Sequence, residues 1–199
     1  MTLYLDYNAS APIIRDVVDI MYKSIDIIGN PSSIHASGRK ARKVIEDSRE
    51  LIGKTIDANP KNIIFTSGAT EANALALSCS REMSTFISSI EHDSVLKQNI
   101  KANIISVTSE GIVNLELLEK MIMKSSEEKI FVSIMAVNNE TGVIQPWQEL
   151  AKICLNKGIF FHCDATQWIG KLDSSFFSLC SSFSASAHKF SGPKGLGLL

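Results

Sequence analysis

The 199-residue chain lacks long apolar runs, a surplus of charge of either sign and any familiar zinc-binding pattern of cysteines. Its purely apolar runs are only a few residues long, such as residues 134–137, whereas a membrane-spanning helix needs about 20 apolar residues. Lysine and arginine number 20 against 21 aspartates and glutamates, so no basic surplus is present to neutralise nucleic-acid phosphates. We expect no secretory signal, because Asp6 interrupts the first apolar residues. We therefore expect a cytoplasmic protein with no membrane or nucleic-acid partner.

Cysteine is scarce, with four residues in the whole chain. No two of them are spaced as Cys-x-x-Cys, and no neighbouring histidine completes a familiar zinc pattern. The four are Cys79, Cys154, Cys163 and Cys180. We expect all four to be reduced packing residues, as is usual for intracellular cysteines, and we predict no metal site.

Internal repeats, low-complexity tracts and linkers rich in proline or glycine are absent as well. Instead, short β-branched or aromatic runs alternate with longer segments of helical period. We predict strands at residues 63–66, 85–90, 104–108, 130–137, 159–163 and 182–185 and from residue 195 onward. We predict helices at residues 16–28, 39–56, 69–80, 94–102, 115–124 and 147–156. This alternation predicts an α/β fold in which a mainly parallel sheet is covered by helices on both faces.

Chemically useful side chains follow five of the predicted strands. Sheets of this kind bind ligands beyond the carboxyl ends of their strands, so these residues are candidates for a binding site. They are the hydroxyl-rich turn at residues 66–70, the pair Glu91 and His92, the amides at residues 138–139, the segment 164–167 and the segment 186–189.

Each feature taken alone also has a plain structural explanation. The turn and Asp164 can serve as helix N-caps, His92 as a core or helix-start histidine, and Lys189 as a solvated surface lysine. The functional alternatives are a phosphate site at a helix N-terminus and a lysine that bonds covalently to a carbonyl group in a cleft. Five such features at five strand ends together favour the functional alternatives.

A lysine, a carboxylate, an aromatic ring and a phosphate turn together fit one cofactor, pyridoxal 5′-phosphate (PLP). The carboxylate of Asp164 would keep the pyridine nitrogen protonated, so that the ring accepts electrons from the substrate α-carbon. A nucleotide site is disfavoured, because the glycines at residues 192–197 lead into a strand, which is the reverse of a dinucleotide fingerprint.

Six segments, in order along nearly the whole chain, resemble motifs of cysteine desulfurases, which are PLP enzymes of fold type I in the class V aminotransferase group. The segments are residues 4–9, 29–35, 65–71, 137–142, 162–167 and 186–195. The resemblance implies the PLP-binding large domain of that fold at residues 16–199, preceded by an N-terminal arm at residues 1–15. It also implies that the large domain is truncated at its C-terminal end and that the small C-terminal domain is missing.

The resemblance also implies roles for individual residues. Lys189 would hold PLP covalently, Asp164 would pair with the pyridinium nitrogen, and His92 would stack on the ring and help proton transfer. The remaining cofactor contacts would be Gln167 and Asn139 near the phenolic oxygen, and Ala69, Thr70, Ser186 and His188 at the phosphate.

The reaction implied by the resemblance removes sulfur from L-cysteine to give alanine and a persulfide for iron–sulfur cluster or tRNA thiolation pathways. A homodimer and a sulfur-acceptor or scaffold protein are the implied partners. The four cysteines of this chain do not match the family's sulfur-accepting motif, so we expect turnover to be impaired. Alternatives are a non-enzymatic remnant, one half of a split enzyme, or another class V PLP enzyme such as a selenocysteine lyase or an aminotransferase.

Overall fold

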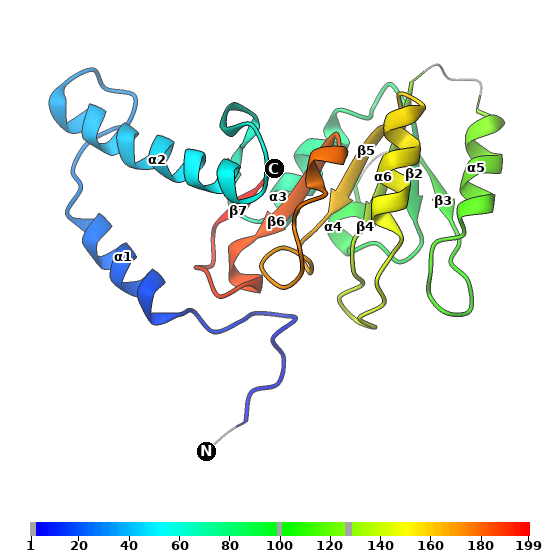
Figure 1. Cartoon of the computed structure of the whole chain (residues 1–199), viewed down its shortest axis with the longest axis horizontal. Coiled ribbons are helices and arrows are strands. Elements are labelled where there is room, and N and C mark those ends of the chain that lie inside the picture. Colours follow the sequence, from blue (N-terminus) through cyan, green and yellow to red (C-terminus); the bar gives the residue numbers. More distant parts are fainter. Residues whose placement is uncertain (1–2, 99–100, 126–128) are drawn as a thin grey trace.

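The computed structural model describes residues 3–98, 101–125 and 129–199 (Figure 1). Its strands are β1 (Phe65–Thr66), β2 (Ser84–Ser88), β3 (Ala102–Ile105), β4 (Ile130–Met135), β5 (Phe160–Asp164), β6 (Ser182–Ser186) and β7 (Gly197–Leu198). Its α-helices are α1 (Arg15–Ile25), α2 (Ala36–Thr55), α3 (Ala69–Ser78), α4 (Asp93–Leu96), α5 (Leu115–Met123) and α6 (Trp147–Asn156). A short 3-10 helix, η3 (Ala187–Lys189), follows β6.

The strands form a seven-stranded sheet in the order β1-β7-β6-β5-β4-β2-β3. From β3 to β6 every neighbouring pair is parallel, whereas β7 is antiparallel to both β6 and β1. The mainly parallel α/β sheet predicted from the sequence is therefore confirmed. Because parallel strands end at the same edge, the residues that follow β2, β4, β5 and β6 come together there.

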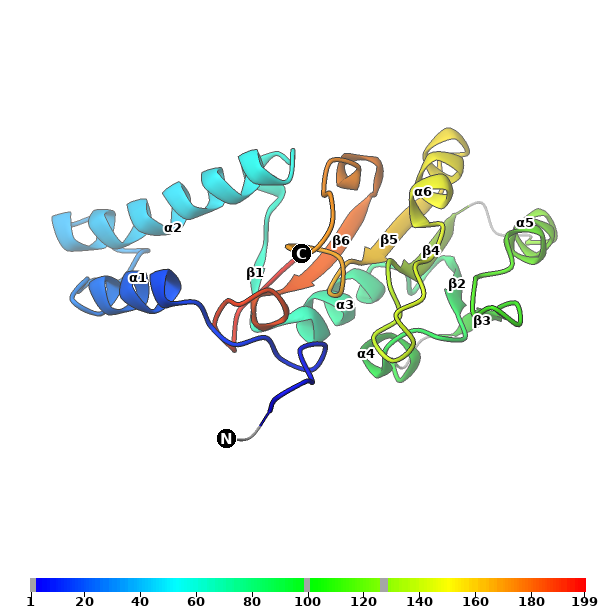
Figure 2. The same ribbon diagram turned by 60° about the horizontal axis from the view of Figure 1, so that its bottom comes forward.

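The two faces of the sheet are filled with different kinds of side chain, since successive strand residues point to opposite faces. On the α6 side, Phe161 and Cys163 of β5 belong to a hydrophobic cluster that includes Trp147. On the α3 side, His162 and Asp164 hydrogen-bond to a buried asparagine of α3. Figure 2 shows α3 and α6 on opposite sides of the sheet. Helical cover on both faces is confirmed, and the face under α3 combines these polar contacts with a smaller apolar cluster that includes Leu77 of α3 and Phe131 of β4.

Several predicted elements differ from the observed ones in their bounds; the strand predicted at residues 104–108, for example, is β3 at Ala102–Ile105. The predicted helix at residues 94–102 is wrong in its second half: α4 ends at Leu96, residues 99–100 lie outside the described residues, and Ala102 already begins β3. Ala102 pairs with Thr85 of β2, so pairing with the neighbouring strand outweighs the local helical pattern. The predicted strand at residues 63–66 is shorter as β1, although Ile64 exchanges backbone hydrogen bonds with Leu199.

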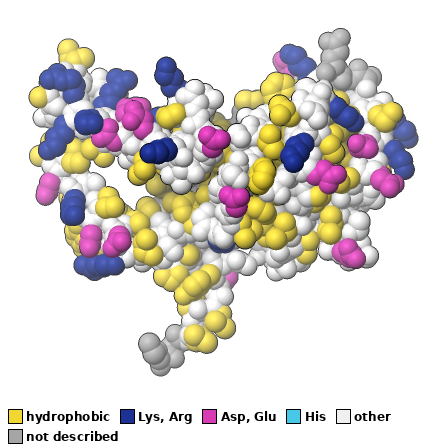
Figure 3. All heavy atoms as spheres, in the orientation of Figure 1, with side chains coloured by type: hydrophobic (Ala, Val, Ile, Leu, Met, Phe, Trp, Pro, Cys, Tyr) yellow, Lys and Arg dark blue, Asp and Glu magenta, His cyan; other side chains and the backbone are white. Residues whose placement is uncertain are grey.

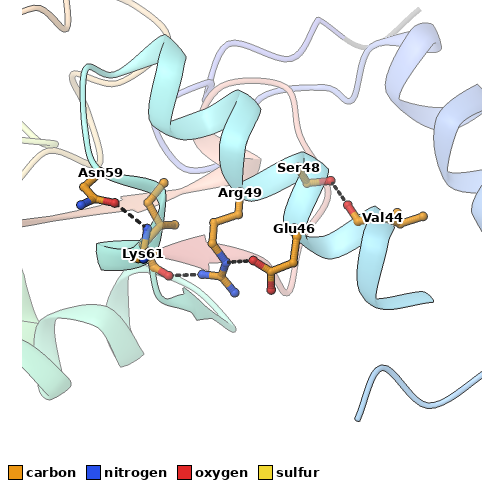
Figure 4. Close-up of polar contacts among 7 residues, drawn as sticks. Val44, Glu46, Ser48, Arg49, Asn59 and Lys61 are labelled. Carbon is orange, nitrogen blue, oxygen red and sulfur yellow. Dashed lines mark hydrogen bonds and ion pairs between the residues drawn. The ribbon is translucent and has the colours of Figure 1, made fainter. Parts of the chain in front are cut away.

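Helix α2 is attached to the sheet through Arg49 (Figure 4). The Arg49 guanidinium donates to the backbone carbonyl of Ile63 and to the Glu46 carboxylate, the latter at 3.3 Å. The same guanidinium lies 4.8 Å from the centroid of the Phe65 ring. These contacts fix the segment that enters β1, and β1 leads directly into the turn before α3.

Helix α1 is amphipathic, yet none of its 11 residues, all of them described, is buried. Its side chains Ile20, Tyr22 and Ile25 are 61–72% exposed. Figure 1 shows α1 below α2 at one end of the molecule, away from the strands, and Figure 3 shows hydrophobic side chains on the surface of the N-terminal part of the chain. Within the described ranges, no helix is both long and apolar enough to cross a membrane.

Candidate active site

A pocket of about 540 Å³ lies at the carboxyl edge of the parallel strands. This volume is within the usual range for small-molecule sites. All the site residues predicted from the sequence line it: Ala69, Thr70, His92, Asn139, Asp164, Gln167, Ser186, His188 and Lys189. The sheet thus brings together side chains that are up to 120 positions apart in the sequence, because they follow strands that end at one edge.

The N-terminus of α3 forms one wall of the pocket. Gly68 is the N-cap, and Ala69 and Thr70, the first two helical residues, line the pocket with Ser186. Backbone N–H groups in a first helical turn have no partner within the helix, and a glycine N-cap has no side chain to cover them. The result is a cradle of N–H and hydroxyl groups that suits a phosphate dianion.

Close packing against β7 holds this cradle in place. A Cβ atom added to Gly197 would come within 2.5 Å of the Gly68 Cα atom, so only glycine permits this approach. Ser67 also lines the pocket, and its N–H and hydroxyl both donate to Glu71 Oε2, at 2.6 and 2.7 Å. The two hydrogen bonds from Ser67 lower the pKa of Glu71.

Lys189 also lines the pocket, at the end of η3 just after β6. Its amine donates to the Asn8 carbonyl at 2.6 Å, and Gln167 Nε2 donates to the same oxygen at 2.9 Å. Partial burial lowers the pKa of Lys189, against the opposing effect of the carboxylates of Asp164 and Asp6. A lysine with a lowered pKa is a better nucleophile toward a carbonyl group, because more of it is neutral.

Asp164 is the last residue of β5 and is 5% exposed. Its two carboxylate oxygens accept from Asn73 Nδ2 at 2.8 Å and from the Thr166 N–H at 3.0 Å. Both contacts are with donors, which suits an ionised carboxylate. A carboxylate held in this way at the floor of the pocket can face a protonated ring nitrogen.

His92 follows β2 and serves as the N-cap of α4. Its Nδ1 atom accepts from the Ser94 N–H at 3.0 Å and lies 2.8 Å from the Ser94 hydroxyl. Because Nδ1 is an acceptor here, a neutral His92 ring carries its proton on Nε2. His92 is therefore both a helix N-cap and a residue that lines the pocket.

The two asparagines after β4 have different surroundings. Asn138 supports the turn, since its Nδ2 donates to the Ile90 carbonyl at 3.0 Å and its Oδ1 accepts from the Thr141 N–H at 2.9 Å. Asn139 lines the pocket, and its carbonyl lies 3.5 Å from Asn8 Nδ2. Of the pair, Asn139 is therefore available to a ligand.

Basic side chains gather where η3 turns toward β7. His188 Nδ1 lies 3.4 Å from the Ser10 hydroxyl. Burial lowers the pKa of His188, and the positive charges of Lys189 and Lys194 lower it further. Lys194 also lines the pocket, so cationic and neutral donors are grouped near Ser186.

Sequence reasoning missed several lining residues. Asn8, Ser67, Gly68, Thr166 and Gly195 are within segments that the motifs already marked, whereas Ser94 and Met135 were not expected at the site. Ser94 and Met135 line the pocket, and Asn8 reaches it through hydrogen bonds to Gln167 and Lys189. Asn8 is in the marked segment 4–9, which was the available signal for the arm.

The cysteines lie away from this pocket, and none is among the described residues that line it. All four are free thiols. Cys154 and Cys163 are buried, and burial raises the pKa of Cys154 to about 12. The expectation that all four are packing residues is wrong for Cys79, which is exposed at the end of α3.

A family model and curated relatives of known name point to the same family. The family model described as "Aminotransferase class-V" matches residues 3–199. The cysteine desulfurase IscS of Dictyoglomus turgidum is 40% identical over 99% of this chain and 53% of its own length. The mitochondrial cysteine desulfurase of Candida albicans is 40% identical over 98% of this chain and 43% of its own length.

Solved structures show the same fold. A NifS-like protein from Rickettsia africae superimposes with a TM-score of 0.92 at 34% identity, covering 100% of this chain and 57% of that protein. A structure described as SspA in complex with cysteine gives a TM-score of 0.86 at 32% identity, covering 99% of this chain and 60% of that one. The chain spans about half the length of the curated relatives it matches. With a family model that covers residues 3–199 and a fold shared with NifS-like proteins, the chain belongs to the class-V aminotransferase family.

Proposed function

We propose that this chain is the PLP-binding portion of a cysteine desulfurase-like protein that acts on L-cysteine. The observation that carries the proposal is the grouping in one pocket of the Lys189 amine, the Asp164 carboxylate and the N-terminus of α3. The relatives named as cysteine desulfurases supply the reaction class, and one similar solved structure is described as a complex with cysteine.

The residues of the pocket fit PLP chemically. Lys189 is a partly buried lysine with a lowered pKa, Asp164 offers a carboxylate to a ring nitrogen, and the cradle at Ala69 and Thr70 offers donors to a phosphate. When bound, PLP supplies an electron sink for the α-carbon of an amino acid. In this assignment His92 stacks on the ring and moves protons at its Nε2 atom.

The resemblance to cysteine desulfurases supplies the remaining roles in this proposal. Gln167 and Asn139 bind the ring's phenolic oxygen, and Ser186 and His188 join the phosphate site with Ala69 and Thr70. Gln167 Oε1 accepts from the Lys171 amine at 2.5 Å, so the NH₂ group of Gln167 is the part that can donate to a ligand. Residues 16–199 form the PLP-binding domain in this proposal, and residues 1–15 form the arm that carries Asn8.

The product and partners belong to the same proposal. Sulfur removed from L-cysteine leaves alanine and passes to an acceptor in iron–sulfur cluster or tRNA thiolation pathways, in a cytoplasmic homodimer. Because none of the described lining residues is a cysteine, we expect this chain alone to release sulfide and alanine slowly or not at all. Rapid release by the isolated chain would contradict that expectation.

The experiment is a titration of the chain with PLP, followed by absorbance. We expect a new band near the visible edge that is lost in Lys189→Ala. The matched control is Lys97→Ala, which removes a 74% exposed lysine paired with Asp93 on α4. The absence of such a band in a folded wild-type sample would refute the cofactor assignment.

A second candidate, one half of a split enzyme, is favoured by the unburied apolar side of α1. Ile20, Tyr22 and Ile25 would then pack against a separately encoded chain. Co-purification of such a chain with the wild type, and its loss in Ile20→Lys, would support this candidate. A wild-type chain that purifies alone and turns over cysteine rapidly would exclude it.

A further inference from the structure

We propose that Asn73, a buried residue of α3, is a positioning residue that sets Asp164 and His92 together through one side-chain amide. The inference rests on the proposed function, because it concerns two side chains assigned to the cofactor ring. Asn73 lies outside the pocket lining, so it acts through its neighbours rather than by touching a ligand.

The amide of Asn73 is fully used by its surroundings. The side chain is 0% exposed, and its Nδ2 donates to Asp164 Oδ2 at 2.8 Å and to the Ser94 hydroxyl at 2.9 Å. Its Oδ1 accepts from the Ser184 hydroxyl at 2.6 Å and lies 3.0 Å from His162 Nε2. Two donors and two lone pairs are the whole capacity of an asparagine amide.

The orientation of this amide is dictated by its partners. A carboxylate only accepts, so the NH₂ group must face Asp164 and Oδ1 must face His162. Burial lowers the pKa of His162 to about 4, with Asp164 acting in the opposite direction. His162 therefore stays neutral, donates from Nε2, and accepts at Nδ1 from the Ser182 hydroxyl at 2.8 Å.

The second branch of the network reaches His92. Because the Ser94 oxygen accepts from Asn73, the hydroxyl proton of Ser94 is free to point at His92 Nδ1, 2.8 Å away. The Ser94 backbone N–H donates to the same nitrogen. Asn73 thus orients the hydroxyl that helps hold the His92 ring, while its other N–H holds the Asp164 carboxylate.

Placement within α3 extends the effect to the phosphate cradle. Asn73 is four residues after Ala69, so it lies one turn along the same side of the helix. The helix that opens with the cradle is thereby joined to β5 through Asp164 and to α4 through Ser94. A single residue fixes the distances between the three places where a cofactor would be held.

The test compares three variants without PLP. Asn73→Leu keeps the approximate shape but removes all the bonds, Ser94→Ala removes only the His92 branch, and Ser80→Ala is the control. Ser80 is a buried residue just after α3, and its hydroxyl donates to the Leu77 carbonyl at 2.8 Å. With ¹⁵N-labelled histidine, we expect the Nδ1 resonance of His92 to move in Asn73→Leu and Ser94→Ala, but not in Ser80→Ala. The resonances of His35, the N-cap of α2, serve as an internal reference.

A second arm uses PLP affinity and a double-mutant cycle. We expect Asn73→Leu to weaken PLP binding about tenfold, equivalent to about 1.4 kcal/mol, and the effect to fall below about twofold when Asp164→Ala is already present. Independent structural damage would add in full instead. Ser94→Ala tests the His92 branch even if Asn73→Leu fails to fold.

The outcomes separate the two proposals. An unmoved His92 resonance in Ser94→Ala, or a tenfold loss that persists in the Asp164→Ala background, overturns the role of Asn73. A wild-type chain that binds no PLP while Asn73→Leu still moves the His92 resonance supports the network and overturns the proposed function.

Discussion

Glu91 is a buried acid beside the site, and its replacement by glutamine should change how stability depends on pH. The side chain is 4% exposed. Its Oε1 accepts from the Ser88 hydroxyl at 2.6 Å and from the Met135 N–H at 2.8 Å, whereas Oε2 has no hydrogen-bond partner within the described part of the chain. Burial raises the pKa of Glu91 from 4.5 to about 8, although the two hydrogen bonds oppose the rise.

The sign of the effect follows from proton uptake. Between pH 4.5 and 8 the folded chain keeps the Glu91 proton that the unfolded chain has lost, so the free energy of unfolding falls as pH rises. At about 1.4 kcal/mol per pH unit, the loss between pH 4.5 and 7 is about 3 kcal/mol. Glu91→Gln removes this loss, since glutamine keeps an oxygen for Ser88 and Met135 and does not ionise.

The assay is urea unfolding of wild type and Glu91→Gln at several pH values from 4.5 to 8. We expect the variant to gain stability relative to wild type as pH rises, by about 3 kcal/mol at pH 7. Taking the difference cancels other titrating groups such as His162, whose lowered pKa makes stability rise with pH between about 4 and 6.5. Glu82→Gln, at an exposed position, is the control. Parallel pH curves for Glu91→Gln and wild type would refute the reasoning.

Three other changes test the packing and the thiols. Gly197→Ala places a Cβ atom 2.5 Å from Gly68. The free energy of unfolding should therefore fall by about 1–3 kcal/mol, and PLP binding should weaken. Unchanged PLP binding would count against a phosphate site at the N-terminus of α3. Trp147→Ala removes a ring stacked 4.5 Å from Phe177 and should cost about 3–5 kcal/mol in urea unfolding, with a smaller loss contradicting its core position. In the native protein a thiol reagent should label the exposed Cys79 rapidly. The buried Cys154 should react only after unfolding, because the thiolate is the reactive form and burial raises the pKa of this thiol. Equal labelling rates of the two cysteines in the native protein would contradict this.

Much of the fold could be predicted from the sequence because its strands leave strong local signals. Residues 130–135 are a nearly unbroken apolar run in a strand buried on both faces. The true end of the helix predicted at residues 94–102 could not be predicted in the same way. Ala102 belongs to β3 because it pairs with Thr85 of β2, and a local sequence pattern does not show this pairing. The exposure of α1 could not be predicted from the sequence either. An amphipathic pattern shows that a helix has an apolar side, but it does not show what packs against that side.

The candidate site was predictable to the extent that its residues follow strands. Asp164 ends β5, and His92 and Lys189 follow the ends of β2 and β6 by four and three residues, at the edge where these parallel strands end. Asn73 was missed because it lies inside a helix, where no strand-end rule applies. A signal was nevertheless present: Asn73 shares the buried side of α3 with Ala76 and Leu77, and a polar residue on an apolar helical side requires a partner.

The two faces of the sheet divide stability and function between them. On the α6 side, Trp147 stacks on Phe177, which in turn lies 4.6 Å from Phe183, and such aromatic packing needs few polar partners. On the α3 side, beside a smaller apolar cluster, His162, Asp164 and Ser184 form hydrogen bonds to Asn73. Sites that hold reactive groups commonly reduce stability locally. Because successive residues of a strand point to opposite faces, β5 contributes Phe161 to one face and Asp164 to the other. The free energy gained by aromatic packing on one face can therefore offset the stability lost by burying polar groups on the other.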